Sequence, residues 1–151
     1  MTKTGLVTTA LSIGLLGTLA TSTITVHAAT LHKGLPQAFV GKWKHHIDYQ
    51  TVQGKTYEQA HLYQGTKHGF ALSTTYNDPL YFPVRYNQYL GNHTYKIHMT
   101  AAYGGQHGII FFHKYSPNKI GFKLSAHGKY MSYNSRKPVE NYPYSWLGLD
   151  D

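Results

Sequence analysis

Gln37-Ala38-Phe39-Val40-Gly41-Lys42-Trp43-Lys44-His45-His46-Ile47-Asp48-Tyr49 is the part of the sequence in which apolar and polar residues alternate most clearly. The large apolar side chains fall on odd positions and the charged or polar ones on even positions: Phe39, Trp43, Ile47 and Tyr49 against Lys42, Lys44, His46 and Asp48. Because successive side chains of a strand point to opposite faces, this pattern predicts one long strand, from about 38 to 51, with a core face and a solvent face.

Seven further segments have strand character, and short stretches rich in Gly, Asn, Asp and Pro separate them. They cover about 56–64, 69–76, 80–86, 94–103, 107–115, 119–126 and 130–135. Short connections favour antiparallel neighbours in chain order, and closing the sheet buries its apolar face and removes exposed edges. We therefore expect an all-β fold, an eight-stranded antiparallel up-and-down meander closed into a barrel over 38–136. A two-sheet β-sandwich is the alternative.

The first 28 residues have the order of a secretory signal peptide. Lys3 is followed by an uncharged apolar run over 5–20, and Val26-His27-Ala28 has the small-residue pattern of a cleavage site. The apolar run is shorter than the roughly 20 residues that a membrane-spanning helix needs. We expect cleavage after Ala28, a secreted protein without a transmembrane segment in the mature chain, a lead-in without strand structure over 29–37, and a tail over 137–151 that packs on or near the barrel.

Gly41 and Trp43 on the first strand, with Arg136 just after the eighth, resemble the calycin superfamily: lipocalins, their small bacterial relatives and avidin-like proteins. The resemblance covers the strand count and order, and these three residues carry its motif. It implies that Trp43 closes one end of the barrel and that Arg136 packs across it, an arrangement that cation–π attraction favours. The chain is also similar to short secreted proteins of Gram-positive bacteria. It lacks the several tryptophans of the avidin site, so biotin is not implied.

The chain is basic, with 14 Lys and Arg against 6 Asp and Glu and a formal net charge of +8. For an exported protein the available polyanions are cell-wall polymers, anionic lipids and acidic glycans, and we expect no nucleic-acid partner. The basic side chains expected on solvent faces are Lys42, Lys44, His46, Lys96, His98, Lys123 and Lys129. They predict loose association with an anionic wall or glycan, or simply a well-solvated surface.

Catalytic motifs are absent from the sequence. It contains no Gly-x-Ser-x-Gly nucleophile motif and no cysteine, and its few acids are not paired by spacing. The histidines include no His-x-His or His-x-x-x-His pair, so no local metal chelate is expected, although a site assembled across strands stays open. We expect no enzyme activity and no cofactor.

Binding of a small, partly apolar ligand inside the barrel is the function favoured by the side chains that the alternation along each strand places inward. Mostly apolar concavities with a few polar tips are typical small-molecule sites. The side chains expected to line it are Trp43, His45, Tyr49, Tyr86, Tyr103, His113 and Tyr133. The alternative is a packed interior in a basic, wall- or glycan-associated surface protein.

Overall fold

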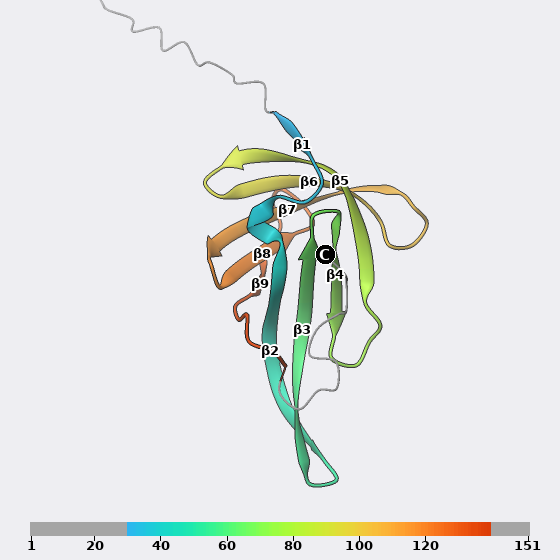
Figure 1. Ribbon diagram of the computed structural model, residues 1–151, viewed down its shortest axis with the longest axis vertical. Helices are drawn as coiled ribbons and strands as arrows, with labels where there is room; N and C mark the ends of the chain where they lie inside the picture. Colours follow the sequence, from blue (N-terminus) through green and yellow to red (C-terminus); the bar gives the residue numbers. More distant parts are fainter. Residues whose placement is uncertain (1–29, 140–151) are drawn as a thin grey trace, which may run out of the picture.

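The computed structural model describes residues 30–139 (Figure 1). Its elements are β1 (Leu31–Lys33), the 3-10 turn η1 (Gln37–Phe39), β2 (Gly41–Val52), β3 (Lys55–Thr66), β4 (Gly69–Thr74), β5 (Leu80–Gly91), β6 (Thr94–Thr100), β7 (His107–Ser116), β8 (Lys119–Lys123) and β9 (Met131–Tyr133). No helix among the described residues is long and apolar enough to cross a membrane.

The strands β2 to β9 form an eight-stranded antiparallel meander that curls into a nearly closed barrel. The barrel comes together where β2 meets the segment just after β9, at Lys44 and Ser135. The Lys44 amide donates a hydrogen bond to the Ser135 carbonyl at 2.7 Å. The Ser135 amide returns a hydrogen bond to the Lys44 carbonyl at 3.1 Å. The all-β barrel predicted from the alternating segments is therefore confirmed.

The segment expected to be a lead-in without strand structure contributes β1, so that expectation is wrong. This strand pairs with the second half of β5, with His32 opposite Asn87. The buried Asn87 amide donates to the carbonyls of His32 and Gly34, at 3.3 and 2.8 Å. A buried amide that binds two main-chain carbonyls thus holds the entering chain beside β5, as an additional strand of the sheet. The first barrel strand starts only at Gly41, because residues 37–39 form η1.

Aromatic side chains fill the middle of the barrel. The buried cluster comprises Leu35, Phe39, Trp43, Tyr63, Phe70, Val84, Ile97, Met99, Ile110, Phe112, Ile120, Phe122 and Tyr133. Phe112 packs edge-on against Phe39 and Phe70, with ring centroids 5.0 Å apart in both pairs. The buried Tyr63 hydroxyl donates to the Phe39 carbonyl at 2.9 Å, so the polar tip of this ring is satisfied. This core replaces the disulfides that the chain lacks.

The second half of β2 leaves the barrel with β3 as a projecting hairpin (Figure 1). A register shift between His46 and Asp48 inserts one unpaired residue, which breaks the simple alternation. Ile47 and Tyr49, both expected on the core face, are 47% and 49% exposed. The core face of this strand therefore ends at His45.

The outer face of β2 and β3 is covered, so the expectation that Lys44 is solvated is wrong. Lys44 is buried, and its ammonium lies 2.5 Å from the Glu58 carboxylate and donates to the Pro138 carbonyl at 2.8 Å. Ala60, Leu62 and Val139 form a second buried cluster beside this pair. Pro138 and Val139 thus contact the outer face of β2 and β3, and residues 140–151 of the expected tail lie outside the described part of the chain.

Pro83 marks the place where β5 changes partner. Residues 80–83 pair with β4, and pairing with β6 begins at Val84. The strand itself continues through this proline, whose missing amide falls where the ladder changes partner. The strand expected over 119–126 ends at Lys123, and Leu124, directly after it, is 69% exposed.

Candidate functional site

Trp43, near the start of β2, packs between two cationic side chains. Its side chain is fully buried, Arg136 Cζ lies 4.6 Å from the ring centroid, and Lys114 Nζ lies 4.5 Å from it. Gly41 has a φ of +134°, and a Cβ there would lie 2.6 Å from Arg136 Nη2. Burial and the Arg136 charge lower the pKa of Lys114. The geometry expected for Gly41, Trp43 and Arg136 is present, with Lys114 as an addition that the sequence did not indicate.

Three of the seven side chains expected to line a ligand cavity lie on the barrel interior. Trp43 and Tyr133 are packed into the aromatic core, and burial raises the pKa of Tyr133. His45 lies on the same face as Trp43, and its ring stacks with that of His61 on β3 at 6.3 Å. The Nδ1 atom of His45 is buried and has no hydrogen-bond partner among the described residues.

The other four do not face the interior, so their expected inward orientation is wrong. Tyr49 follows the irregularity in β2, and Tyr103 lies in the turn after β6, where it is 79% exposed. A register shift between Val84 and Tyr86 turns Tyr86 outward, onto the His98 ring at 4.3 Å. His113 lies on the face opposite the buried Phe112 and hydrogen-bonds Thr94 at 2.9 Å.

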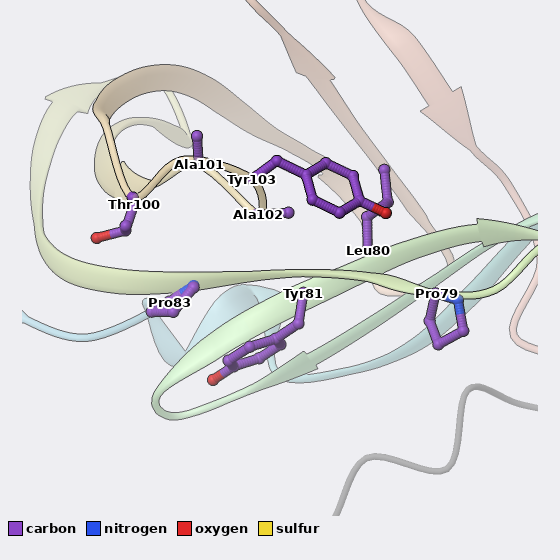
Figure 2. Close-up of a pocket in the computed structure, with 9 residues that line it drawn as sticks. Pro79, Leu80, Tyr81, Pro83, Thr100, Ala101, Ala102 and Tyr103 are labelled. Carbon is purple, nitrogen blue, oxygen red and sulfur yellow. The ribbon is translucent and has the colours of Figure 1, made fainter.

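A hollow of about 450 Å³ opens where β5 separates from β6 (Figure 2). It is lined by Pro79, Leu80, Tyr81, Pro83, Thr100, Ala101, Ala102, Tyr103 and Gly105. Figure 2 shows these side chains on two facing segments, the start of β5 and the turn that follows β6. The volume is in the range of small-molecule sites, but the lining offers few polar groups that would orient a ligand.

A cluster of rings and ammonium groups covers the outer face of β7 and β8. We call His113, Tyr115, Lys119, Lys123 and Tyr130 the aromatic ledge. Its ring centroids lie 4.3 Å apart for His113 and Tyr115 and 5.7 Å apart for His113 and Tyr130. Lys119 Nζ lies 5.0 Å from the Tyr115 centroid, and Lys123 Nζ lies 4.8 Å from that of Tyr130.

Gly121 makes the ledge possible. A Cβ at this position would lie 3.0 Å from Tyr115 Cε2 and 3.5 Å from Tyr130 Cβ, so a larger residue would displace the rings. Burial and the neighbouring Tyr130 raise the pKa of Tyr115, whereas burial and His93 lower the pKa of His113. At neutral pH the ledge therefore carries its positive charge on the two lysines.

The electrostatic surroundings of the ledge are positive. The sequence contains no Asp or Glu from residue 79 to residue 139, and this stretch includes Arg85, Lys96, Lys114, Lys119, Lys123, Lys129, Arg136 and Lys137. Sequence reasoning missed the ledge because its rings come from β7 and from the segment before β9, and its lysines come from β8. The acid-free stretch was the signal available for finding it.

Metal ligands do not converge in the described part of the chain. Across residues 30–139 no group of three or more His, Asp or Glu side chains is placed to hold a metal ion. His98 Nδ1 and His107 Nε2 lie 3.1 Å apart on the outer face of β6 and β7, the closest approach of two histidines recorded there.

Comparison with known proteins yields no relative: no protein-family model, no curated protein and no solved structure matches the chain. The nearly closed, eight-stranded antiparallel barrel is consistent with a calycin-like fold.

Proposed function

We propose that this is a secreted, non-catalytic binding protein that attaches to an anionic glycan polymer of the bacterial cell wall through the aromatic ledge. The observation that carries the proposal is the ledge itself, three neighbouring rings with two ammonium groups on an acid-free outer face. The contact of Arg136 with the Trp43 ring, in the space beside Gly41, supports assigning the barrel to the calycin superfamily.

The ledge combines the two groups that such a polymer needs. Ring faces stack on the apolar faces of sugars, and ammonium groups attract the phosphates or carboxylates between the sugars. The contacts of Lys119 with Tyr115 and of Lys123 with Tyr130 hold the ammonium groups at the rings before any ligand arrives. Such preorganisation reduces the entropy lost on binding.

The packed interior favours binding on the outside of the barrel, because the protein's own side chains fill the inside. Tyr63, Phe70 and Phe112 meet in its middle and are all nearly inaccessible to solvent. Most residues expected to line a cavity either point outward or belong to this cluster. A polymer bound outside requires no rearrangement of the core.

Co-sedimentation with purified Gram-positive cell walls tests the proposal. The protein should pellet with walls at low salt and be released at about 1 M salt, where the screening length falls to about 3 Å. Replacing Tyr115 and Tyr130 by Ala and Lys119 and Lys123 by Gln should abolish pelleting at low salt.

The matched control is the Lys55–Tyr57 cation–π pair of the β2–β3 hairpin, with Nζ 5.4 Å from the ring centroid. A Lys55→Gln/Tyr57→Ala variant removes the same kinds of side chain elsewhere and should pellet like the wild type. A folded ledge variant that still pellets at low salt contradicts the proposal, as does equal loss in the control.

A second candidate, a small ligand at the inner face of β2, is favoured by the buried and unpaired Nδ1 of His45. A buried polar atom without a partner costs about 1–3 kcal/mol, which a ligand that hydrogen-bonds to it would recover. Native mass spectrometry of protein purified from its culture medium should then show a retained small molecule that His45→Leu loses. A ligand-free wild-type protein would exclude this candidate.

A further inference from the structure

Arg136 is held in place by its contact with Trp43, but its hydrogen-bonding donors are left open. The guanidinium lies over the indole at 4.6 Å, in space that Gly41 leaves by lacking a side chain. It makes no hydrogen bond to another described residue, and the residue is exposed. A planar guanidinium with fixed orientation presents a fork of N–H donors suited to an oxyanion.

These donors border a hollow of about 490 Å³ at the Trp43 end of the barrel. Its lining consists of Asn118, Asn134, Ser135, Arg136, Lys137 and Pro138. Asn118 lies in the turn between β7 and β8, and the other residues follow β9, so the hollow lies between two segments distant in sequence. The Ser135 hydroxyl accepts the Lys137 amide at 3.2 Å, which fixes this turn of the chain. The lining thus offers two cations with amide and hydroxyl groups.

Positive charge at this end of the barrel is uncompensated within residues 30–139. The ion pairs among residues 30–139 join Lys44 and His46 to Glu58, on the outer face of β2 and β3. Lys114, Arg136 and Lys137 have no carboxylate within 4 Å among these residues. Burial is the main cause of the lowered pKa of Lys114, and the neighbouring Arg136 charge adds to it. A bound anion would offset this positive charge.

We propose that the hollow is a binding site for a phosphate group, with Arg136 and Lys137 as its charged ligands and Asn118 and Asn134 as neutral donors. A tetrahedral oxyanion can accept hydrogen bonds from several directions at once, which suits donors on two sides of a hollow better than a planar carboxylate does. The volume leaves room for a sugar- or glycerol-sized group attached to the phosphate.

The lining of the hollow shares no residue with the aromatic ledge, although Asn118 directly precedes Lys119 in the sequence. The phosphate could belong to a phosphodiester-linked wall polymer or to a free phosphate ester, and both present the same group to Arg136. Phosphate binding here does not require the ledge to bind a polymer, so the two proposals can fail separately.

Isothermal titration calorimetry with the full mature chain tests the site, with inorganic phosphate, glycerol 3-phosphate, a glycerol-phosphate oligomer and acetate as probes. Two-dimensional NMR of the Trp43 indole N–H reports occupancy beside Arg136. Phosphate and glycerol 3-phosphate should bind saturably, shift this resonance and bind more tightly than acetate. If the glycerol-phosphate oligomer binds more tightly than glycerol 3-phosphate, the natural phosphate group belongs to a polymer. If the two bind equally, it belongs to a free phosphate ester.

The Arg136→Gln and Lys137→Gln variants should each weaken phosphate binding roughly tenfold or more, since charge-assisted hydrogen bonds contribute about 1.5–3 kcal/mol. Lys55→Gln removes the same charge at the start of β3, in the tip of the β2–β3 hairpin, and should change binding less than twofold. Because Arg136 also packs on Trp43, Lys137→Gln and Asn134→Ala test the site without touching that contact. Unsaturable binding, equal effects of Lys55→Gln and Lys137→Gln, or acetate binding as tightly as phosphate would overturn the proposal.

Discussion

Trp43 connects more parts of the chain through its own side chain than its place on one strand indicates. It is fully buried, it donates from Nε1 to the Pro117 carbonyl at 3.4 Å, and it carries both Arg136 and Lys114 on its ring. The residue therefore joins three parts of the chain: the first barrel strand, the β7–β8 turn and the segment after β9. Packing and cation–π attraction act at the same ring.

Replacing Trp43 by Ala should lower the free energy of unfolding by about 3–5 kcal/mol, because it leaves a large cavity in the core. Urea denaturation of the two proteins measures this difference. Trp43→Phe should lose less, since an aromatic ring remains beneath Arg136. A loss of under about 1 kcal/mol for Trp43→Ala would show that the ring does not close the barrel.

Gly41→Ala should be more destabilising than Gly54→Ala, and only the former should disturb Trp43. Both glycines have positive φ, at +134° and +76°, so each substitution strains the backbone by about 1–2 kcal/mol. At Gly54 nothing lies within 4 Å of the added Cβ, whereas at Gly41 Arg136 must move. Tryptophan fluorescence and denaturation should separate the two, and an unchanged spectrum in Gly41→Ala would argue against the stacked arginine.

Two histidines should make stability fall in mild acid. Burial, Lys96 and His107 lower the pKa of His98, and burial and His93 lower that of His113. As the pH falls through about 6.5, the unfolded chain takes up protons at these positions before the folded chain does, so folding loses stability. The urea midpoint should decrease less between pH 7.5 and 5.5 in His98→Gln/His113→Gln than in the wild type. Equal decreases would contradict the assignment.

At the scale of the strands, register shifts decide which side chains face inward. The period-two rule places Trp43 and Tyr133 correctly because no irregularity lies between them and the core. It fails for Tyr49 and Tyr86, because each lies beside a shift that a single sequence does not reveal. It fails for Tyr103 because β6 ends at Thr100.

The outer face of β2 and β3 should depend on one buried ion pair. Glu58→Gln removes the partner of Lys44 and leaves a buried ammonium without its counter-charge, which should cost about 3–5 kcal/mol of unfolding free energy. The exposed Asp48→Asn serves as a charge-matched control and should stay within about 0.5 kcal/mol. A Lys44→Met/Glu58→Leu double variant should recover much of the loss. Equal stability of Glu58→Gln and Asp48→Asn would show that the pair is not structural.

At the scale of the whole molecule, the sequence predicts the architecture better than the surface. Alternation and turn residues suffice for an eight-stranded meander, because each strand is a local pattern. The aromatic ledge and the Arg136 hollow join residues from different strands and turns, and the covered face of Lys44 depends on Pro138. Such surfaces arise only when the barrel closes, which a pattern within one strand does not encode.

The most direct test of the central claim, that the outer face binds the polymer, is an NMR titration of the labelled protein with a soluble anionic wall polymer. The largest backbone shifts should fall on residues 113–123 and 130, outside the barrel, and should vanish in the ledge variant. His45, Tyr63 and Tyr133 report the interior and should shift little. Shifts centred on these three residues, with the ledge unchanged, would contradict outer-face binding and favour a ligand inside the barrel.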